Sequence, residues 1–167
     1  EQVNALQHFN RRVLERLRPV GLSELGLREA IGALQRLWRE THPGVAIETA
    51  SSPSLGETGD TAELTIYRVI QEALTNVFRH ARATRVDIRV EAAQPRRTEA
   101  GETEAIMVTI SDNGAGLPTD HKQGFGMLGM RERAQGVGGD VVIAGEPGRG
   151  TTVLVTIPRQ PNGRIHP

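Results

Sequence analysis

Residues 60–81, DTAELTIYRVIQEALTNVFRHA, carry the strongest periodic signal in the chain. Apolar side chains recur there at three- and four-residue spacing, at Ile66, Ile70, Ala73, Leu74, Val77, Phe78 and Ala81. An apolar stripe of this kind is typical of a helix that packs against a core. We therefore predict one long helix over residues 60–81 with its apolar side buried.

A second stripe on the same segment is polar, with Glu72, Asn76 and His80 at successive four-residue steps. That spacing places the carboxylate and the amide on one helical face, about one turn apart. An amide oxygen can bind Mg²⁺ where phosphate oxygens and waters complete the coordination. A carboxylate one turn away can orient or deprotonate a hydroxyl group or a water. Taken alone, however, such a stripe is more often a solvated helix surface.

Shorter periodic segments on both sides of this helix indicate two layers. Helices are predicted over residues 1–17, 25–39 and 127–136, and strands over residues 45–49, 86–90, 106–110, 141–144 and 152–157. The polar residues 93–103 between two strands are interpreted as a mobile hairpin tip. Because neighbouring strands have short connections, we expect a two-layer α/β sandwich, with a mixed, mostly antiparallel sheet and helices packed on one face.

The composition argues against several classes of function. Twenty Lys and Arg balance twenty Asp and Glu in 167 residues, so the basic surplus of a nucleic-acid binder is absent. The chain has no cysteine, which excludes thiol catalysis, disulfides and Cys-based zinc sites. Its only lysine, Lys122, lies outside any Gly-Lys-Ser/Thr motif, so a P-loop and a eukaryotic-type protein kinase site are excluded. No apolar run is long enough to span a bilayer.

A short acidic loop, Asp112-Asn-Gly-Ala-Gly116, follows directly after the predicted strand 106–110. A carboxylate at a strand end can accept a hydrogen bond from an exocyclic amine such as adenine N6. Gly114 and Gly116 allow the backbone to turn and a flat ring to approach closely. An ordinary Asp-Asn-Gly turn would look the same in sequence.

Two glycine-rich segments come next, at residues 124–130 (GFGMLGM) and 148–152 (GRGTT). The first follows a polar loop rather than a strand, so the dinucleotide-binding reading of G-x-G-x-x-G fails. A glycine turn that opens a helix near Met127 still offers backbone amides to phosphates. The second segment fits either a plain hairpin turn or a hydroxyl-bearing wall of the same pocket.

The order of these motifs resembles the Bergerat-type (HATPase_c, GHKL) ATP-binding domain of sensor histidine kinases, DNA gyrase, Hsp90 and MutL. Residues 67–76 (YRVIQEALTN), 79–81 (RHA), 126–133 (GMLGMRER) and the glycine pair 138–139 resemble the sensor histidine kinases that work with NarL-type response regulators, the HisKA_3 subfamily. Residues 17–19 (LRP), 25–27 (LGL) and Trp38 resemble the junction before their ATP-binding domain. The resemblance covers residues 12–158.

For the nucleotide, the resemblance implies ATP with Mg²⁺. It places a magnesium ligand at Asn76 and a carboxylate for positioning or proton transfer at Glu72. Arg79 and His80 are expected near the phosphates, and Asp112 is expected to bind adenine N6.

The resemblance also assigns the glycine segments. Gly114 and Gly116 are expected to flank the adenine ring, residues 117–123 to form a short lid, and Thr151 to support Asp112. The remaining implied ATP-binding residues are Gly124, Phe125, Gly126, Met127, Leu128, Gly129 and Thr152.

Kinases of this subfamily phosphorylate a histidine followed by Asp, and none of the five histidines here precedes an Asp. Since the chain opens at Glu1, we interpret it as a fragment of a longer sensor. We expect residues 1–20 to be the end of a dimerisation region, residues 21–158 the ATP-binding catalytic domain and residues 159–167 a tail. On its own the fragment is expected to bind ATP without phosphorylating itself.

The implied partners are the sensor's own dimerisation domain and a NarL-type response regulator, with no nucleic acid. The full-length protein is expected to be a homodimer, the fragment a monomer, and the domain cytoplasmic with any membrane anchor outside these residues. Two alternatives stay open: a GHKL-type ATPase clamp in which Glu72 activates water, and a non-catalytic ATP-sensing or anti-sigma-like binding module.

Overall fold

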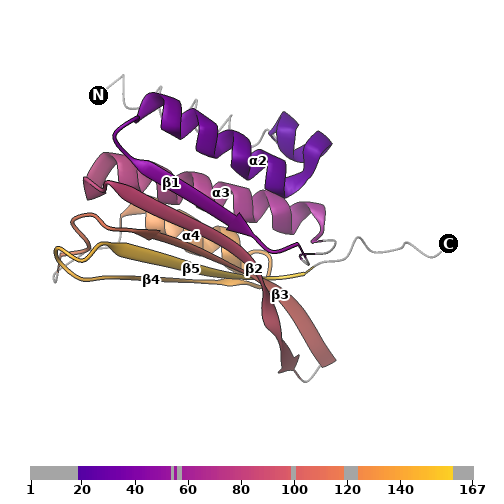
Figure 1. The fold of residues 1–167 in the computed structure, drawn as a ribbon. Helices are drawn as coiled ribbons and strands as arrows, with labels where there is room; N and C mark the ends of the chain where they lie inside the picture. The colour runs from indigo at the N-terminus through magenta and orange to yellow at the C-terminus, as the bar shows by residue number, and fades with distance from the viewer. Residues whose placement is uncertain (1–18, 54, 56–57, 99–100, 119–123, 160–167) are drawn as a thin grey trace, which may run out of the picture.

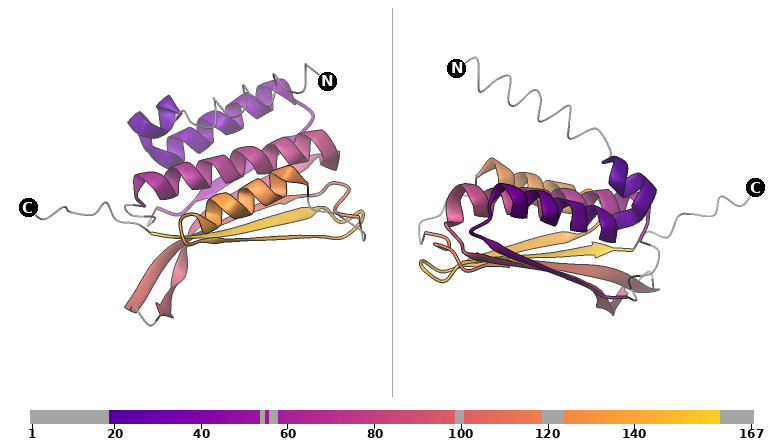
Figure 2. Two further views of the ribbon diagram at one scale, coloured as in Figure 1. Left: turned by 180° about the vertical axis from the view of Figure 1, so that it is seen from behind. Right: turned by 45° about the horizontal axis from the view of Figure 1, so that its top comes forward.

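The computed structural model describes residues 19–53, 55, 58–98, 101–118 and 124–159. Three helices cover one face of a five-stranded sheet, which makes two layers (Figures 1 and 2). The predicted α/β sandwich is therefore confirmed. The helix predicted over residues 1–17 and residues 119–123 of the predicted lid lie outside the described part of the chain.

The sheet has the strand order β1-β2-β3-β5-β4. The strands are β1 (Ala46–Ser51), β2 (Arg85–Thr98), β3 (Gly101–Asp112), β4 (Asp140–Gly145) and β5 (Thr151–Pro158). Only β1 and β2 pair in parallel, and the other three pairs are antiparallel. This agrees with the predicted mixed, mostly antiparallel sheet.

Strands β2 and β3 are longer than predicted, because residues 93–98 and 101–103, which we assigned to a hairpin tip, belong to the strands. The two strands pair through Thr98 and Gly101, with a register irregularity between Ala93 and Arg96. Figure 1 shows this ribbon projecting beyond the helical layer. Backbone hydrogen bonds between two strands do not require an apolar face. The alternation of apolar residues therefore stops where the strands leave the core, although the strands themselves continue.

The three described helices match the predicted ranges closely, except that the first begins five residues earlier than predicted. They are α2 (Val20–Thr41), α3 (Asp60–Asn76) and α4 (Phe125–Gln135), with a π-helical segment η1 (Val77–Ala81) continuing α3. A kink at Gly26, whose φ is 82°, interrupts α2. The predicted 60–81 helix is therefore present, but its last five residues form a π-turn instead of an α-helix.

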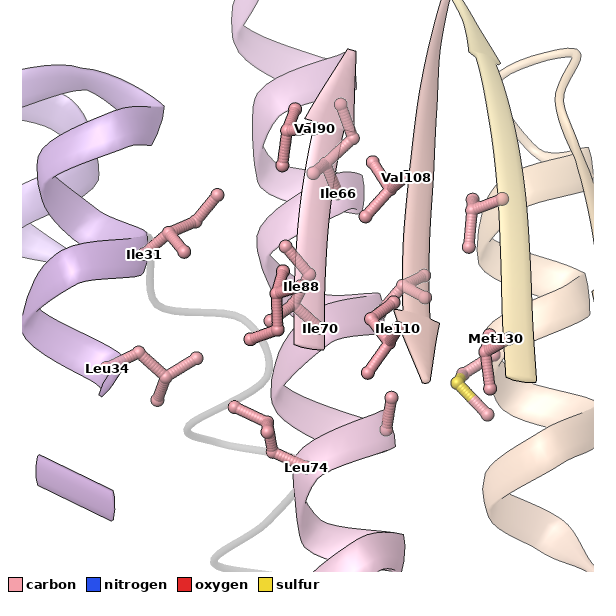
Figure 3. Close-up of a cluster of buried hydrophobic side chains, with 14 of the residues drawn as sticks. Ile31, Leu34, Ile66, Ile70, Leu74, Ile88, Val90, Val108, Ile110 and Met130 are labelled. Atoms are coloured by element: carbon pink, nitrogen blue, oxygen red, sulfur yellow. The ribbon is translucent and has the colours of Figure 1, made fainter. Parts of the chain in front are cut away.

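The core lies between the sheet and the helices, with α3 at its centre (Figure 3). Ile66, Ile70 and Leu74 of α3 are fully buried against β2 and β3. The apolar stripe of α3 thus faces the sheet. The polar stripe of the same helix, which includes Glu72 and Asn76, lies beside the apolar one. Within the described residues, no helix combines the length and hydropathy needed to cross a bilayer.

Candidate functional site

A cavity of about 970 Å³ lies where α3 and η1 meet the loop after β3, the start of α4 and the β4–β5 turn. Eleven residues that the sequence singles out line it: Glu72, Asn76, Arg79, His80, Asp112, Gly116, Gly124, Phe125, Gly126, Met127 and Thr151. These residues come from four separate stretches of sequence, 72–80, 112–116, 124–127 and Thr151. The fold therefore brings the predicted motifs together around one space.

Four other predicted site residues do not line this cavity. The Leu128 side chain is 45% exposed on α4, and Gly129 faces the side chain of Arg133. The Thr152 hydroxyl is hydrogen-bonded to Ser111 Oγ at 2.9 Å. Gly114 packs against η1, where an added Cβ would come within 2.2 Å of the Ala81 carbonyl oxygen.

Asp112 ends β3 with its carboxylate at the cavity. Its Oδ1 accepts a hydrogen bond from the Gly114 N–H at 2.7 Å, and the Thr151 N–H is a further donor to the carboxylate. Burial raises the pKa of the Asp112 carboxyl, and these two backbone donors oppose that rise. Thr151 thus contacts Asp112 through its backbone N–H.

The neighbouring Asn113 has a structural role. Its Oδ1 accepts hydrogen bonds from the backbone N–H groups of Thr84 and Arg85, both at 2.9 Å. Its Nδ2 donates to Thr84 Oγ1 at 2.9 Å. Asn113 therefore ties the end of β3 to the start of β2, while Asp112 lines the cavity.

Two glycines near Asp112, Gly116 in the cavity wall and Gly150 in the β4–β5 turn, have a positive φ and no room for a side chain. At Gly116, φ is 72° and an added Cβ would lie 1.9 Å from the Glu146 carbonyl oxygen. At Gly150, φ is 81° and the Cβ would lie 1.9 Å from the Asp112 carbonyl oxygen. Only glycine fits both the backbone angle and the space. The two loops beside Asp112 therefore pack backbone against backbone.

Glu72 is only 8% exposed, so the alternative of a solvated polar face is wrong for this residue. Asn76 is half-buried and His80 is exposed. Gly126, in the first turn of α4, lies so close that an added Cβ would be 2.3 Å from Glu72 Oε1 and 3.5 Å from Asn76 Oδ1. The start of α4 and the polar stripe of α3 therefore form one continuous wall.

Helix α4 begins two residues before the predicted position, with Gly124 preceding its first turn. Gly124, Phe125, Gly126 and Met127 all line the cavity. The first N–H groups of a helix have no partner within the helix, and together with the helix dipole they favour an anion. This end of the cavity is suited to phosphate oxygens.

Leu117 and Pro118 of the predicted lid also line the cavity. The sequence analysis missed the rest of the apolar lining: Ala73, Val77, Ala81, Ile110, Ala115, Met130, Ile143, Pro147 and Val153. Those on α3 and η1 follow from helical spacing relative to Glu72 and Asn76. Ile143 and Pro147 had no local signal, because their place depends on β4 forming the edge beside β5. Together these residues give the cavity the apolar surface that a flat ring needs.

The raised pKa of Asp112 predicts a particular pH dependence of stability. Since the folded protein holds this proton to a higher pH than the unfolded chain, the free energy of unfolding should fall as pH rises from the ordinary aspartate range through the raised pKa. Above that pKa the contribution is constant. Urea unfolding at a series of pH values, without nucleotide, should show this fall in the wild type and not in Asp112→Asn.

Asp87 provides the control of opposite sign. A hydrogen bond from Arg85 lowers the pKa of Asp87, so its contribution to stability is present above the ordinary aspartate range and is lost as pH falls through the lowered pKa. Asp87→Asn should remove that loss and leave the Asp112 contribution in place. Identical pH profiles for the wild type and Asp112→Asn would contradict the assignment.

Comparison with known proteins identifies the family. The family model of the histidine kinase-, DNA gyrase B- and HSP90-like ATPases matches residues 61–161. The signal transduction histidine-protein kinase/phosphatase DegS of Brevibacillus brevis is 32% identical over 150 residues, which are 89% of this chain and 36% of that protein. The signal transduction histidine-protein kinase/phosphatase UhpB of Salmonella typhimurium is 35% identical over 151 residues, which are 90% of this chain and 28% of that protein. The chain thus spans about a third of the length of these curated relatives.

Solved structures share the fold. The histidine kinase AdeS of Acinetobacter baumannii superposes with a TM-score of 0.68 over 95% of this chain and 81% of that chain, at 14% identity. The ATP-binding domain of PrrB from Mycobacterium tuberculosis superposes with a TM-score of 0.58 over 79% of this chain and 93% of that chain, at 17% identity. From the family match, the curated relatives and the motifs gathered around one cavity, the chain belongs to the histidine kinase-, DNA gyrase B- and HSP90-like ATPases, and within them to the sensor histidine kinases.

Proposed function

We propose that the chain binds ATP with Mg²⁺ and donates the γ-phosphate to a histidine on the dimerisation domain of its own sensor. The phosphate would then pass to an aspartate of a NarL-type response regulator. The observation that carries this proposal is the single cavity that has Asp112 on one wall and Glu72, Asn76, Arg79 and His80 on another. One end suits a purine and the other suits a phosphate chain.

In this proposal the adenine end is built on Asp112. Its carboxylate accepts a hydrogen bond from adenine N6, with Thr151 and Gly114 holding it through their N–H groups. Gly116 lets the ring lie close to the backbone, and the apolar lining packs against the ring faces. Burial of the carboxylate strengthens such a hydrogen bond, because it competes less with water.

The phosphate end is built on α3, η1 and the start of α4. Arg79 contributes positive charge, Arg79 and His80 both contribute hydrogen-bond donors, and the N–H groups near Gly126 bind phosphate oxygens. Glu72 orients or deprotonates the acceptor. Phosphoryl transfer requires mainly positioning and charge neutralisation, so these residues supply most of what the reaction needs.

Asn76 is the proposed magnesium ligand. Among the described residues, no group of three or more His, Asp or Glu side chains is placed to hold a metal ion. The half-buried Asn76 amide beside Glu72 fits an ion that takes its other ligands from phosphate oxygens and waters, as Mg²⁺ commonly does. When bound, the ion would neutralise charge on the phosphates.

We further propose that residues 21–158 form the catalytic unit and that the whole sensor is a homodimer. Any membrane anchor would lie in other segments of the sensor, with this domain in the cytoplasm. These proposals follow the relatives, which are named histidine kinases.

Phosphate transfer to a separate helical hairpin tests the function. The chain is mixed with radiolabelled ATP, Mg²⁺ and a histidine-containing hairpin from a sensor of this subfamily. Acid-labile label on the hairpin histidine is the expected result. Release of free phosphate without such label would indicate an ATPase clamp instead, and neither product would indicate a non-catalytic binding module.

Substitution of Asn76 tests the magnesium assignment. Asn76→Ala should lower Mg²⁺-dependent transfer much more than it lowers adenosine binding, because the adenine end of the cavity stays intact. Transfer rates are measured across a Mg²⁺ titration, and adenosine binding by calorimetry. Asn113→Ala, which removes an amide that does not line the cavity, serves as the control. An unchanged Mg²⁺ dependence in Asn76→Ala would contradict the assignment.

A further inference from the structure

An aromatic cluster joins the end of α2 to the π-turn η1. The Trp38 and Phe78 rings are stacked, with centroids 4.4 Å apart and planes at 6°. The His42 ring lies against the same Phe78 ring, with centroids 4.2 Å apart. Aromatic pairs have preferred relative orientations, so this contact fixes Phe78 relative to the end of α2 more closely than an aliphatic contact would.

The end of α2 is a firm support for this cluster. The His42 N–H donates to the Trp38 carbonyl at 2.9 Å, which closes the helix. Gln35, one turn earlier, donates from Nε2 to the Ile47 carbonyl of β1 at 2.7 Å. The Trp38 Nε1 is buried and has no hydrogen-bond partner within the described residues. The indole therefore acts here through its ring, and the ring is attached to a helix that is itself tied to the sheet.

The π-turn presents two sides. Val77, Arg79, His80 and Ala81 line the cavity, and Phe78 does not. Phe78 is the member of η1 that stacks on α2. Phe78, which contacts α2, thus lies in the same five-residue turn as Arg79 and His80, the two exposed polar residues at the proposed phosphate end.

A π-turn is intrinsically less favourable than a continued α-helix and persists where its surroundings hold it. Two contacts hold the ends of η1. The Val77 N–H bonds back to the carbonyls of Ala73 and Leu74, and the Ala81 carbonyl accepts the Ala115 N–H at 2.7 Å. Arg82 then leaves the turn at a φ of 50°. Between these two ends, the aromatic cluster is the support on the outer side.

We propose that Phe78 and Trp38 are positioning residues, which hold η1 so that Arg79 and His80 reach the phosphate end of the bound nucleotide. This inference rests on the proposed function. Asp112 belongs to β3 and is placed by the sheet. Loosening η1 should therefore weaken contacts to the phosphates and leave contacts to adenine unchanged.

The measurement is the ratio of ATP affinity to adenosine affinity, determined by calorimetry with Mg²⁺ on the whole chain. Phe78→Leu keeps an apolar side chain and removes the stacked ring. We expect it to lower the ratio about tenfold, as the loss of one charge-assisted contact would, with adenosine affinity unchanged. Phe78→Tyr retains the ring and should retain the ratio. A purely structural role for Phe78 would lower thermal stability without changing the ratio.

Further variants keep the result interpretable. Trp38→Leu removes the same stacking contact from the α2 side and replaces Phe78→Leu as the test if that variant does not fold. Trp38→Phe keeps an aromatic ring and should keep the wild-type ratio of ATP affinity to adenosine affinity. Arg79→Ala and His80→Ala measure how much of the ratio depends on these side chains. Val90→Ala, at a buried core position of β2 that does not line the cavity (Figure 3), controls for lost stability.

The outcomes are distinct. If Phe78→Leu and Trp38→Leu both keep the wild-type ratio, or if Val90→Ala lowers it equally, the inference is wrong. If Arg79→Ala and His80→Ala leave the ratio unchanged, the positioned groups are not the phosphate contacts and the inference is again wrong. If the wild type binds neither ATP nor adenosine, the proposed function has failed instead.

Discussion

Replacing Asp112 with alanine is expected to weaken ATP binding about tenfold to hundredfold, because a hydrogen bond to a charged, partly buried acceptor contributes roughly 1.5–3 kcal/mol. The carboxylate already has backbone donors in Gly114 and Thr151, which hold it at the cavity. Calorimetry with Mg²⁺ at a pH above the raised pKa of Asp112 measures the loss directly. Asp140→Ala removes an exposed carboxylate at the end of β4 that is away from the β4–β5 turn and the cavity, so this variant should bind ATP as the wild type does.

The same carboxylate should discriminate between purines. Guanine presents an acceptor oxygen where adenine presents an amine, so GTP should bind more weakly than ATP to the wild type. Asp112→Asn can donate as well as accept, and the difference between ATP and GTP should shrink in that variant. If both nucleotides displace a fluorescent adenine nucleotide from the wild type equally well, Asp112 does not read the base.

Replacing Gly150 with alanine is expected to lower the free energy of unfolding by about 2–4 kcal/mol, which combines left-handed strain with overpacking. Its φ is 81°, and the new Cβ would lie 1.9 Å from the Asp112 carbonyl oxygen. Because that atom belongs to the backbone, the β4–β5 turn or the end of β3 must move. Urea unfolding measures the loss, and ATP binding should fall as well, since Asp112 is displaced.

Gly148 offers a matched control within the same turn. Its φ is 75°, but nothing lies within 4 Å of an added Cβ. Gly148→Ala should therefore cost only the backbone strain, about 1–2 kcal/mol, and leave ATP binding unchanged. Equal losses of stability in the two variants would show that the close approach of Gly150 to Asp112 is not the cause.

Much of the fold follows from local periodicity. The helix 60–81 and three of the five strands were found close to their observed bounds, because burial of one face imposes a period of 3.6 or 2 on the sequence. The exception is the β2–β3 ribbon, where residues 93–103 have no apolar alternation. Pairing there depends on backbone hydrogen bonds between strands, which leave no mark in the side-chain pattern.

The candidate site was predicted in part. The motif residues around Asp112, Asn76 and Gly126 have a local signature, and eleven of them line the cavity. The apolar wall from Ile143 and Pro147 did not have one, nor did the burial of Glu72. Burial depends on which element covers a residue, and Glu72 is covered by the first turn of α4, more than fifty residues later in the chain.

The sequence by itself determined most of the element types and the order of the motifs, since these depend on each residue's own backbone and near neighbours. The tertiary structure decided the rest: that Glu72 is buried, that Asn113 ties two strands together, and that Trp38 stacks on Phe78 behind the π-turn. Each of these depends on contacts between segments far apart in the chain. Such contacts form only when the sheet and its helical layer have packed, so no local pattern can encode them.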